Sequence, residues 1–517
     1  MSRTRQATVS VLFGYAQFAL AAGTGVFLFP FILHRVGMDA YGLWLAFGEL
    51  LAYSSMLDLG MLSVLPWLIA EDDGRGDRQS MQATISAGLL VSVIAAIASS
   101  ALALGLLAFS PRVANITDAQ RAIVLGPFLV MVAGGAVAYP LRVYYGLLVG
   151  LQDAFFVGLV TALDLLLGIV ITIVLLLRGN GLYALAYALV LPQALAYCAC
   201  LVRARYLVPD LVTTWVRPTG AQVRRLTTQG AGAWASGLGW RMVAATNSLV
   251  ILRVSGPAMV AVYVVTTKLS DVFMQLSWQL PDSGLVGLAQ LWGEGKSERV
   301  REIVIAMLRL MLLGAGAVAC VVVAFNSAFV GAWVGADKFA GMRVTVVVAA
   351  SVLALSLGHS LLSTAATLGK RLESGYATLA QGLVHVVMAL ALGKVFGLAG
   401  IAAAGFMGVM VVVYPFSIRA LNEVAGLTHV VIWRETLLPW LKRAVPLLVV
   451  GTMVGVLFPH LTLTLIVLGP LLGALYVILM RGLLKGVPVP ARVRGFLTRV
   501  RVLPAETAAT PSIAGDV

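Results

Sequence analysis

The residues most able to do chemistry in this sequence are charged side chains that interrupt long apolar segments. Each one costs about 2.5–3.5 kcal/mol at the centre of a membrane-spanning helix, so it should face a cavity or a partner. Arginine and lysine suit an anion such as phosphate, whereas carboxylates suit a coupling cation or proton. The candidates for the anion are Arg241, Lys268 and Arg142, with Asn247 beside them, and the candidates for the cation are Glu49, Asp58, Asp164, Asp271 and Asp282.

Arg241 is the strongest candidate for contacting an anion. It lies about ten residues into an apolar segment, too deep for its side chain to reach the surface easily. Its planar guanidinium can donate two hydrogen bonds to one phosphate group, and Asn247 is a candidate hydrogen-bonding partner. The alternative is a structural salt bridge from Arg241 to an acid in another span.

Three charges gather in the segment at residues 259–285. At about 100° per residue, Lys268, Asp271 and Asp282 share one helical face, unless Pro281 rotates the last turn. One interpretation is a Lys268–Asp271 pair that neutralises itself. The other is a cavity-facing site for a coupling cation or proton, with Lys268 near an anionic substrate.

Other polar positions are more isolated. Glu49, Asp58 and Asp164 each either pair structurally or bind a coupling ion. Arg142 is followed by tyrosines at 144 and 145, which could form a sugar-stacking or phosphate site, but it is also close enough to the inner surface to extend toward water. The histidines at 359 and 385 are expected to be packed core residues rather than proton relays.

About fourteen apolar segments carry these residues, and nearly all could cross a bilayer as a helix of roughly 20 residues. The composition agrees, because 60% hydrophobic residues, 11% charged residues and a mean hydropathy of +0.97 are typical of a multi-pass membrane protein. The sequence therefore predicts an all-α polytopic membrane protein. The segments are residues 9–33, 41–69, 81–109, 122–150, 154–177, 182–202, 231–252, 259–285, 302–325, 343–368, 376–396, 398–421, 444–458 and 461–480.

Several other classes of protein are excluded by missing motifs. The three cysteines lie inside apolar segments, which gives neither a disulfide framework nor a zinc spacing. No Walker-type phosphate loop is present, because Gln290 stands where its first glycine should be. We therefore expect no cofactor and no metal. The first apolar segment is expected to be retained, since no clear signal-peptide cleavage site is present.

The net charge of +14 follows alternate loops, as the positive-inside rule predicts. It therefore indicates membrane topology and argues against nucleic acid as a partner. With an even number of spans, both termini are expected in the cytoplasm. The outer loops are short and leave no room for a catalytic domain. The longest inner connection, residues 203–230, is rich in arginine and is expected to link two halves.

The two halves of the chain resemble each other. Residues 32–44 align without gaps on residues 251–263, with identical Ile, Leu and Gly, and such repeats set the architecture of many transporters. The predicted organisation is a six-helix bundle at 1–202, a cytoplasmic linker at 203–230, a second six-helix bundle at 231–424, two additional spans at 425–480 and a basic cytoplasmic tail at 481–517.

Several stretches of sequence also resemble a known family. They are PFILHRVGMDAYGLW at 30–44, LLAYSSMLDLG at 50–60, IAEDDGRGD at 69–77, GLLVGLQDAF at 146–155 and GAWVGADKF at 331–339. Together with the spacing of the spans, they resemble bacterial polysaccharide flippases of the O-antigen and exopolysaccharide type, in the multidrug/oligosaccharidyl-lipid/polysaccharide exporter superfamily. The resemblance implies two pseudo-symmetric six-helix bundles around a central cavity, with two extra C-terminal helices.

The resemblance further implies a function, a location and partners. The protein would move a lipid-linked oligosaccharide, carried on undecaprenyl pyrophosphate, from the inner to the outer leaflet of the bacterial inner membrane by alternating access. Polysaccharide polymerase and glycosyltransferases would be its further partners. One alternative is a multidrug exporter of the same superfamily, which would need an acidic and aromatic pocket. The other is a membrane glycosyltransferase or polymerase, which would need a sizeable outer loop that this sequence lacks.

Overall fold

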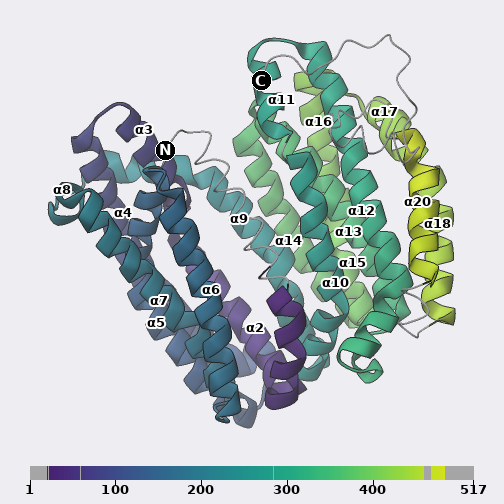
Figure 1. The fold of residues 1–517 in the computed structure, drawn as a ribbon, viewed down its shortest axis with the longest axis horizontal. Helices are drawn as coiled ribbons and strands as arrows, with labels where there is room; N and C mark the ends of the chain where they lie inside the picture. Colours follow the sequence, from purple (N-terminus) through teal and green to yellow (C-terminus); the bar gives the residue numbers. More distant parts are fainter. Residues whose placement is uncertain (1–19, 21–22, 59, 283, 459–466, 484–517) are drawn as a thin grey trace. The chain divides into compact units, whose positions relative to one another are not determined.

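The computed structural model describes residues 20, 23–58, 60–282, 284–458 and 467–483, and every regular element in them is helical. The chain divides into two compact units, Met1–Ala261 with Thr378–Val386, and Val262–Ala377 with Val387–Val517. Within each unit, long helices lie side by side (Figure 1).

The first unit holds the N-terminal helices. They are the helix Gly23–Val36, α2 (Met38–Ser54), the 3-10 turn η1 (Ser55–Asp58), α3 (Met61–Gly74), α4 (Arg78–Ala114), α5 (Asp118–Gly150), α6 (Ala154–Leu177), α7 (Leu182–Leu207), α8 (Pro209–Thr213) and α9 (Gly220–Ser255). The predicted linker at 203–230 is largely helical. Helix α9, which we expected to open the second bundle, packs within the first unit against α2, α3 and α4.

The second unit contains most of α10 and the helices that follow it. They are α10 (Pro257–Asp282), α11 (Leu285–Gly293), α12 (Ser297–Trp333), η2 (Ala336–Lys338), α13 (Met342–Ala365), η3 (Ala366–Lys370), α14 (Arg371–Phe396), α15 (Leu398–Gly408), η4 (Val409–Val413), α16 (Tyr414–Ala425), α17 (His429–Ile432), η5 (Trp433–Leu437), α18 (Leu438–Leu457), α20 (Gly469–Met480) and η7 (Arg481–Leu483). Residues 378–386 of α14 are grouped with the first unit.

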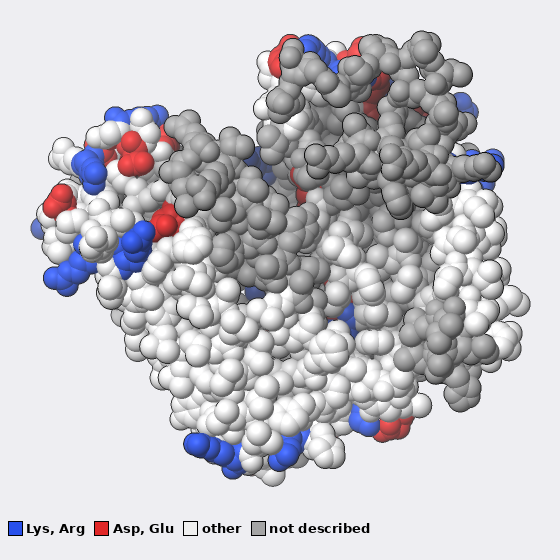
Figure 2. All heavy atoms as spheres, viewed as in Figure 1, with Lys and Arg blue, Asp and Glu red and all other residues white. Residues whose placement is uncertain are grey.

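Much of this helical structure is suited to a membrane. In the described part of the chain, nine helical stretches are long and apolar enough to cross a bilayer. One of them, Met342–Phe396, contains two predicted spans separated by non-helical backbone at Leu368 and Gly369. On the face of the first unit seen in Figure 2, charged side chains gather at the helix ends and leave a nearly uncharged band between them. The fold is all-α and of the membrane type, while a total of fourteen spans stays a prediction.

The prediction of one continuous helix at residues 41–69 was wrong. Helix α2 ends at Ser54, η1 follows, and α3 begins only at Met61. Gly60 has a φ of 72°, and a Cβ at this position would lie 2.6 Å from the carbonyl oxygen of Gly230 in α9. Only glycine adopts this backbone conformation at low cost. The break therefore depends on a glycine packed directly against α9.

A side chain of α9 also bonds to the interrupted backbone. Trp234 Nε1 donates a hydrogen bond to the carbonyl oxygen of Met56, at 2.7 Å. A backbone carbonyl near a helix end inside a membrane needs such a donor, because lipid offers none. Helix α9 thus stabilises the discontinuity between α2 and α3.

A buried carboxylate ties three helices of the first unit together. Asp72, near the end of α3, is only 1% exposed and accepts hydrogen bonds from Ser80 Oγ at 2.8 Å and Thr84 Oγ1 at 3.3 Å, both on α4. Arg225 of α9 lies 3.7 Å from Asp72 Oδ1 and 3.2 Å from Glu71 Oε2. Because a buried charge is tolerated when it is paired and hydrogen-bonded, this network holds α3, α4 and α9 at one end.

In the second unit α12 is the central helix, and it packs against α13 and α18. Arg309, the charged residue deep within α12, has a structural partner. The backbone carbonyl of Glu435 lies in the π-helical segment η5, which interrupts the i→i−4 bonding pattern of an α-helix. Arg309 Nε of α12 donates to that carbonyl at 2.9 Å, and Arg309 Nη2 lies 3.9 Å from Glu435 Oε2. Arg309 is therefore used in packing.

Candidate functional site

Helices α2 and α9 carry two of the charges that stood out in the sequence of the first unit, Glu49 and Arg241. Neither helix is among the nine stretches apolar enough to span a bilayer, although the 36 residues of α9 would extend about 54 Å at 1.5 Å per residue. Inside a membrane, polar helix faces must be covered by protein or line a wet cavity. These two helices are therefore the natural place for a polar site.

The two charges meet on the facing sides of α2 and α9. Arg241 Nη1 lies 3.9 Å from Glu49 Oε2, and the two side chains stay 39% and 28% exposed. This distance is at the limit for an ion pair, and the guanidinium makes no closer polar contact within the described residues. Arginine normally binds carboxylates through shorter, often bidentate hydrogen bonds. Arg241 thus has an acid nearby that balances its charge while most of its donors stay available to a ligand.

A tyrosine that the sequence analysis did not single out completes the contact between α2 and α9. Tyr53 is one helical turn after Glu49, and its hydroxyl shares a hydrogen bond of 2.7 Å with Thr246 Oγ1. The same hydroxyl lies 3.5 Å from the carbonyl oxygen of Arg241. The signal in the sequence is the Glu49-x-x-x-Tyr53 spacing, which places both side chains on one face.

Asn247 points toward a different neighbour from the one expected. Its Oδ1 lies 3.0 Å from Nε2 of His385 on α14, within the first unit. His385 is only 1% exposed. The histidine is therefore a hydrogen-bonded interior residue, and Asn247 is its partner on α9.

A second polar group in the first unit contains two more predicted residues. Arg142 of α5 and Asp164 of α6 both lie within electrostatic range of the Tyr197 hydroxyl on α7. Tyr197 packs edge-to-face on Tyr145, with ring centroids 6.1 Å apart, while Tyr144 is buried in the core. Arg142 itself is exposed. The structure thus places Arg142 and Asp164 near one tyrosine, which the sequence analysis had not identified.

The predicted charges of the second unit all lie on α10. Lys268 interacts electrostatically with Asp271, whose Oδ2 also accepts a hydrogen bond from Thr267 Oγ1 at 3.3 Å. Asp271 is nevertheless exposed. Asp282 pairs with His359 of α13 at 2.9 Å. The side chain of Asp58, the remaining predicted acid, lies outside the described part of the structure.

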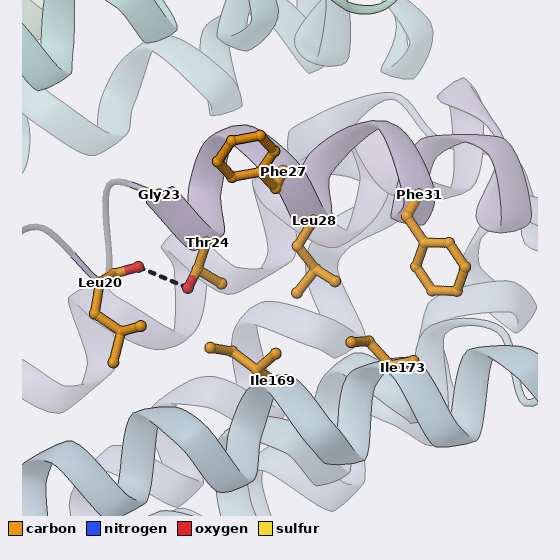
Figure 3. A pocket seen from close by; sticks show the side chains of 8 residues that line it. All are labelled: Leu20, Gly23, Thr24, Phe27, Leu28, Phe31, Ile169 and Ile173. Atoms are coloured by element: carbon orange, nitrogen blue, oxygen red, sulfur yellow. Dashed lines mark hydrogen bonds between the residues drawn. The ribbon is translucent and has the colours of Figure 1, made fainter.

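An apolar groove also opens between the helix Gly23–Val36 and α6. It has a volume of about 500 Å³, and Figure 3 shows Leu28 and Phe31 pointing toward Ile169 and Ile173 across it. Among the described residues that line it, Thr24 alone has a polar side chain, and its hydroxyl donates to the carbonyl of Leu20 at 2.7 Å. The guanidinium of Arg35 lies 5.7 Å from the ring centre of Phe31, so a cation stands close to one end of the groove.

The described residues contain no cluster of three or more His, Cys, Asp or Glu side chains that could hold a metal ion. In the first unit, Arg241 can donate to an anion and Glu49 can accept from a cation. In the second unit, the exposed Asp271 can accept from a cation. Each of these groups can bind a charged ligand reversibly.

Solved structures of transporters have the same fold. The chain is similar to a multidrug resistance MATE family transporter of the MOP superfamily in an inward-facing conformation, with a TM-score of 0.61 and 17% identity, covering 81% of this chain and 95% of that one. It is also similar to MATE in a bent conformation, with a TM-score of 0.56, 16% identity and coverage of 82% and 95%. No protein-family model and no curated protein sequence matches the chain. The fold is thus similar to that of MATE transporters of the MOP superfamily.

Proposed function

We propose that this protein is an alternating-access transporter that moves a polyprenyl-pyrophosphate-linked oligosaccharide from the inner to the outer leaflet of the bacterial inner membrane. The transporter fold supports the general class. The observation that supports this choice of substrate is the guanidinium of Arg241 on α9, which is half-exposed and has a loosely held acid beside it. A lipid pyrophosphate is an anion of the kind that such a guanidinium binds best.

Glu49 has a defined part in this proposal. Without substrate, its carboxylate offsets the charge of Arg241 at 3.9 Å. When pyrophosphate arrives, its oxygens take the guanidinium donors and Glu49 is released. Binding therefore exchanges one ion pair for a stronger one and does not leave a bare charge in the membrane, which would be costly. Lys268, Arg142 and Asn247 stay as proposed contributors to substrate binding.

The apolar groove gives a place for the lipid part of the same substrate. Its lining is apolar, and its one hydroxyl is already bonded to the backbone. An isoprenoid chain, which has no polar groups, could lie against these residues without leaving a hydrogen-bonding group unsatisfied. The head group would then contact cationic residues while the chain stays in apolar surroundings.

A second function has its own support. The solved structures with this fold include a multidrug resistance transporter, and Glu49 and Asp271 are carboxylates that a cationic drug could contact. This alternative needs the acids, rather than Arg241, to bind the substrate. The two functions therefore predict opposite results when Arg241 is removed.

The test is complementation of a flippase-deficient strain, measuring surface polymer and lipid-linked repeat units together. Wild type should restore polymer. Arg241→Ala should express normally but leave the repeat units on the inner leaflet. Arg241→Lys should fall between them, because lysine keeps the charge and loses the two-pronged geometry. Arg224→Ala is the matched control, since Arg224 is an exposed arginine of the same helix, and it should complement like wild type.

Two results would contradict the flippase proposal. The first is full complementation by Arg241→Ala at normal expression. The second is a wild type that restores no polymer in several polysaccharide backgrounds but lowers drug susceptibility, with that effect lost in Glu49→Gln and retained in Arg241→Ala. The second result would establish the drug exporter in its place.

A further inference from the structure

A histidine in the second unit is held between an acid and an indole. His359 Nε2 lies 2.9 and 3.1 Å from the two carboxylate oxygens of Asp282. The ring of Trp278 stacks on the imidazole, with ring centroids 4.0 Å apart and 5° between the planes. Trp278 Nε1 donates to Ser356 Oγ at 2.9 Å. The imidazole is therefore fixed in one orientation by groups on two sides.

The sequence spacing explains why these four side chains meet. Trp278 and Asp282 are one turn apart on α10, and Ser356 and His359 are one turn apart on α13. Each helix thus contributes two neighbouring side chains from a single face. Neither helix alone brings an acid to a histidine, so the pair exists only while α10 and α13 are packed together.

The cluster lies where a helix is interrupted. Asp282 is the last residue of α10, Pro281 precedes it, and α11 starts at Leu285. The C-terminal end of a helix carries a partial negative charge, and interrupted helices of transporters use such ends to bind cations. The helix end and the carboxylate of Asp282 both interact favourably with an imidazolium, so this place suits the binding of a proton.

Other charges do not intrude on the pair. Helices α11 and α15 and the segment η4 contain no Asp, Glu, Lys or Arg, and among the described residues no further ion pair reaches Asp282 or His359. Most charged groups of the elements packed nearby have partners elsewhere: Arg309 with Glu435, Arg299 with Glu302, Lys370 and Arg419 with Glu423, and Arg443 with the Pro439 carbonyl. The others, Glu298, Arg301, Arg343 and Lys442, lie toward helix ends.

We propose that Asp282 and His359 form a proton-binding site, and that this site couples proton movement to transport, a role that rests on the proposed function. A carboxylate can only accept hydrogen bonds, so Nε2 of His359 donates to Asp282 and an incoming proton binds at Nδ1. The pair then passes from one net negative charge to none. Because a net charge in this region favours water over apolar surroundings, protonation shifts the equilibrium between an open and a closed arrangement around the end of α10.

Trp278 reports on this site directly, because an imidazolium quenches a stacked indole more strongly than a neutral imidazole does. The experiment measures tryptophan fluorescence of the purified full-length protein against pH, and subtracts the same titration of Trp278→Phe. The difference should show a single one-proton step. The step should be lost in His359→Gln, and its midpoint should move in Asp282→Asn.

His429 gives the matched control. Its ring also stacks on a tryptophan, Trp433, with ring centroids 6.3 Å apart, but its Nδ1 is hydrogen-bonded to the Tyr414 hydroxyl rather than to an acid. His429→Gln should leave the Trp278 step unchanged. Melting curves check that each variant is folded. If His359→Gln unfolds, Asp282→Asn decides, because its amide keeps the shape of the carboxylate.

Three outcomes overturn the proposal: no step in the wild type, a step that survives in His359→Gln, or a step that appears only when sodium chloride replaces choline chloride, which would make this a sodium site. The titration needs no substrate, so it is independent of complementation. A one-proton step that follows His359 in a protein that restores no polymer would support the proton site and contradict the proposed function. A protein that restores polymer but shows no such step would support the proposed function and contradict the proton site.

Discussion

The role proposed for Arg241 depends on how loosely its side chain is held. A buried arginine with a close bidentate acid has a structural role. Arg309, bonded to the Glu435 carbonyl at 2.9 Å, is likewise fixed in packing. Arg241 is 3.9 Å from Glu49 and is partly exposed. The same residue type therefore serves packing in one helix and stays available to a ligand in another, and the difference lies in the partner distances.

The hydroxyl contact beside Arg241 should contribute measurably to stability. Removing the phenolic oxygen in Tyr53→Phe breaks the 2.7 Å hydrogen bond to Thr246, and a typical hydrogen bond contributes about 0.5–1.5 kcal/mol net. We expect a destabilisation of that size in denaturant or thermal melts. In a double-mutant cycle with Thr246→Val, the two losses should be less than additive. Fully additive losses would show that the hydroxyls do not interact.

Asp72 should be far less tolerant. In Asp72→Asn an amide group replaces an oxygen in a side chain that is 1% exposed and accepts from two hydroxyls. Breaking a buried charged network costs about 3–5 kcal/mol, so we expect a large drop in melting temperature or in yield of folded protein. Asp73→Asn, an exposed neighbour, should behave like wild type. Equal stability of the two variants would contradict the structural role of Asp72.

At the scale of elements, the interruption between α2 and α3 is the feature that hydropathy could not reveal. The residues around the break remain apolar, so the mean hydropathy along the sequence does not change there. The break depends instead on the left-handed backbone of Gly60 and on the indole of Trp234, which comes from a distant part of the sequence. Backbone geometry and long-range donors are both invisible to periodicity.

Two glycines of the same region should therefore respond in opposite directions to an added methyl group. Gly60→Ala forces a left-handed residue, at a cost of about 1–2 kcal/mol, and also brings a Cβ within 2.6 Å of the Gly230 carbonyl. Gly48→Ala, inside α2, meets nothing within 4 Å and should stabilise the helix by about 0.5–1 kcal/mol. Thermal melts of both variants test this, and a neutral Gly60→Ala would argue against the break.

For the candidate site, the sequence indicated candidate residues but not which residues they meet. It identified Arg241, Glu49, Asp282 and Asp164 because a charge within an apolar run is conspicuous. It left open which acid would pair with Arg241, and it treated His359 as a packed histidine. A partner on another helix depends on how the helices pack, and no local pattern encodes that.

At the scale of the whole molecule, some helices follow directly from apolar runs. Helix α6 covers the predicted residues, because the turn after it contains glycine and asparagine that end the run. Helix α9 is a long helix but is too polar to qualify as a span. Residues 231–252 stand out as an apolar segment in the sequence, yet the whole helix falls short of the hydropathy of a span, because its polar residues lower the average.

The direction in which the chain crosses the membrane can be tested at the ends of α12. In a background without its three cysteines, Glu294→Cys and Asp337→Cys would flank this 37-residue helix. If charge distribution sets topology, an impermeant thiol reagent should label position 337 in intact cells and position 294 only in inverted vesicles. Labelling of both from the same side would show that α12 does not cross the bilayer.

The hydrogen bond between Arg309 and the Glu435 carbonyl also predicts a pattern of sequence variation. The arginine supplies a donor where the π-helical segment η5 interrupts the bonding pattern of an α-helix. In a relative whose chain continues here as a regular α-helix, the backbone would satisfy that carbonyl by itself, and the arginine would be free to change. The arginine and the π-helical segment should therefore occur together, and substituting Arg309 should be harmful where that segment is present and nearly neutral where it is absent.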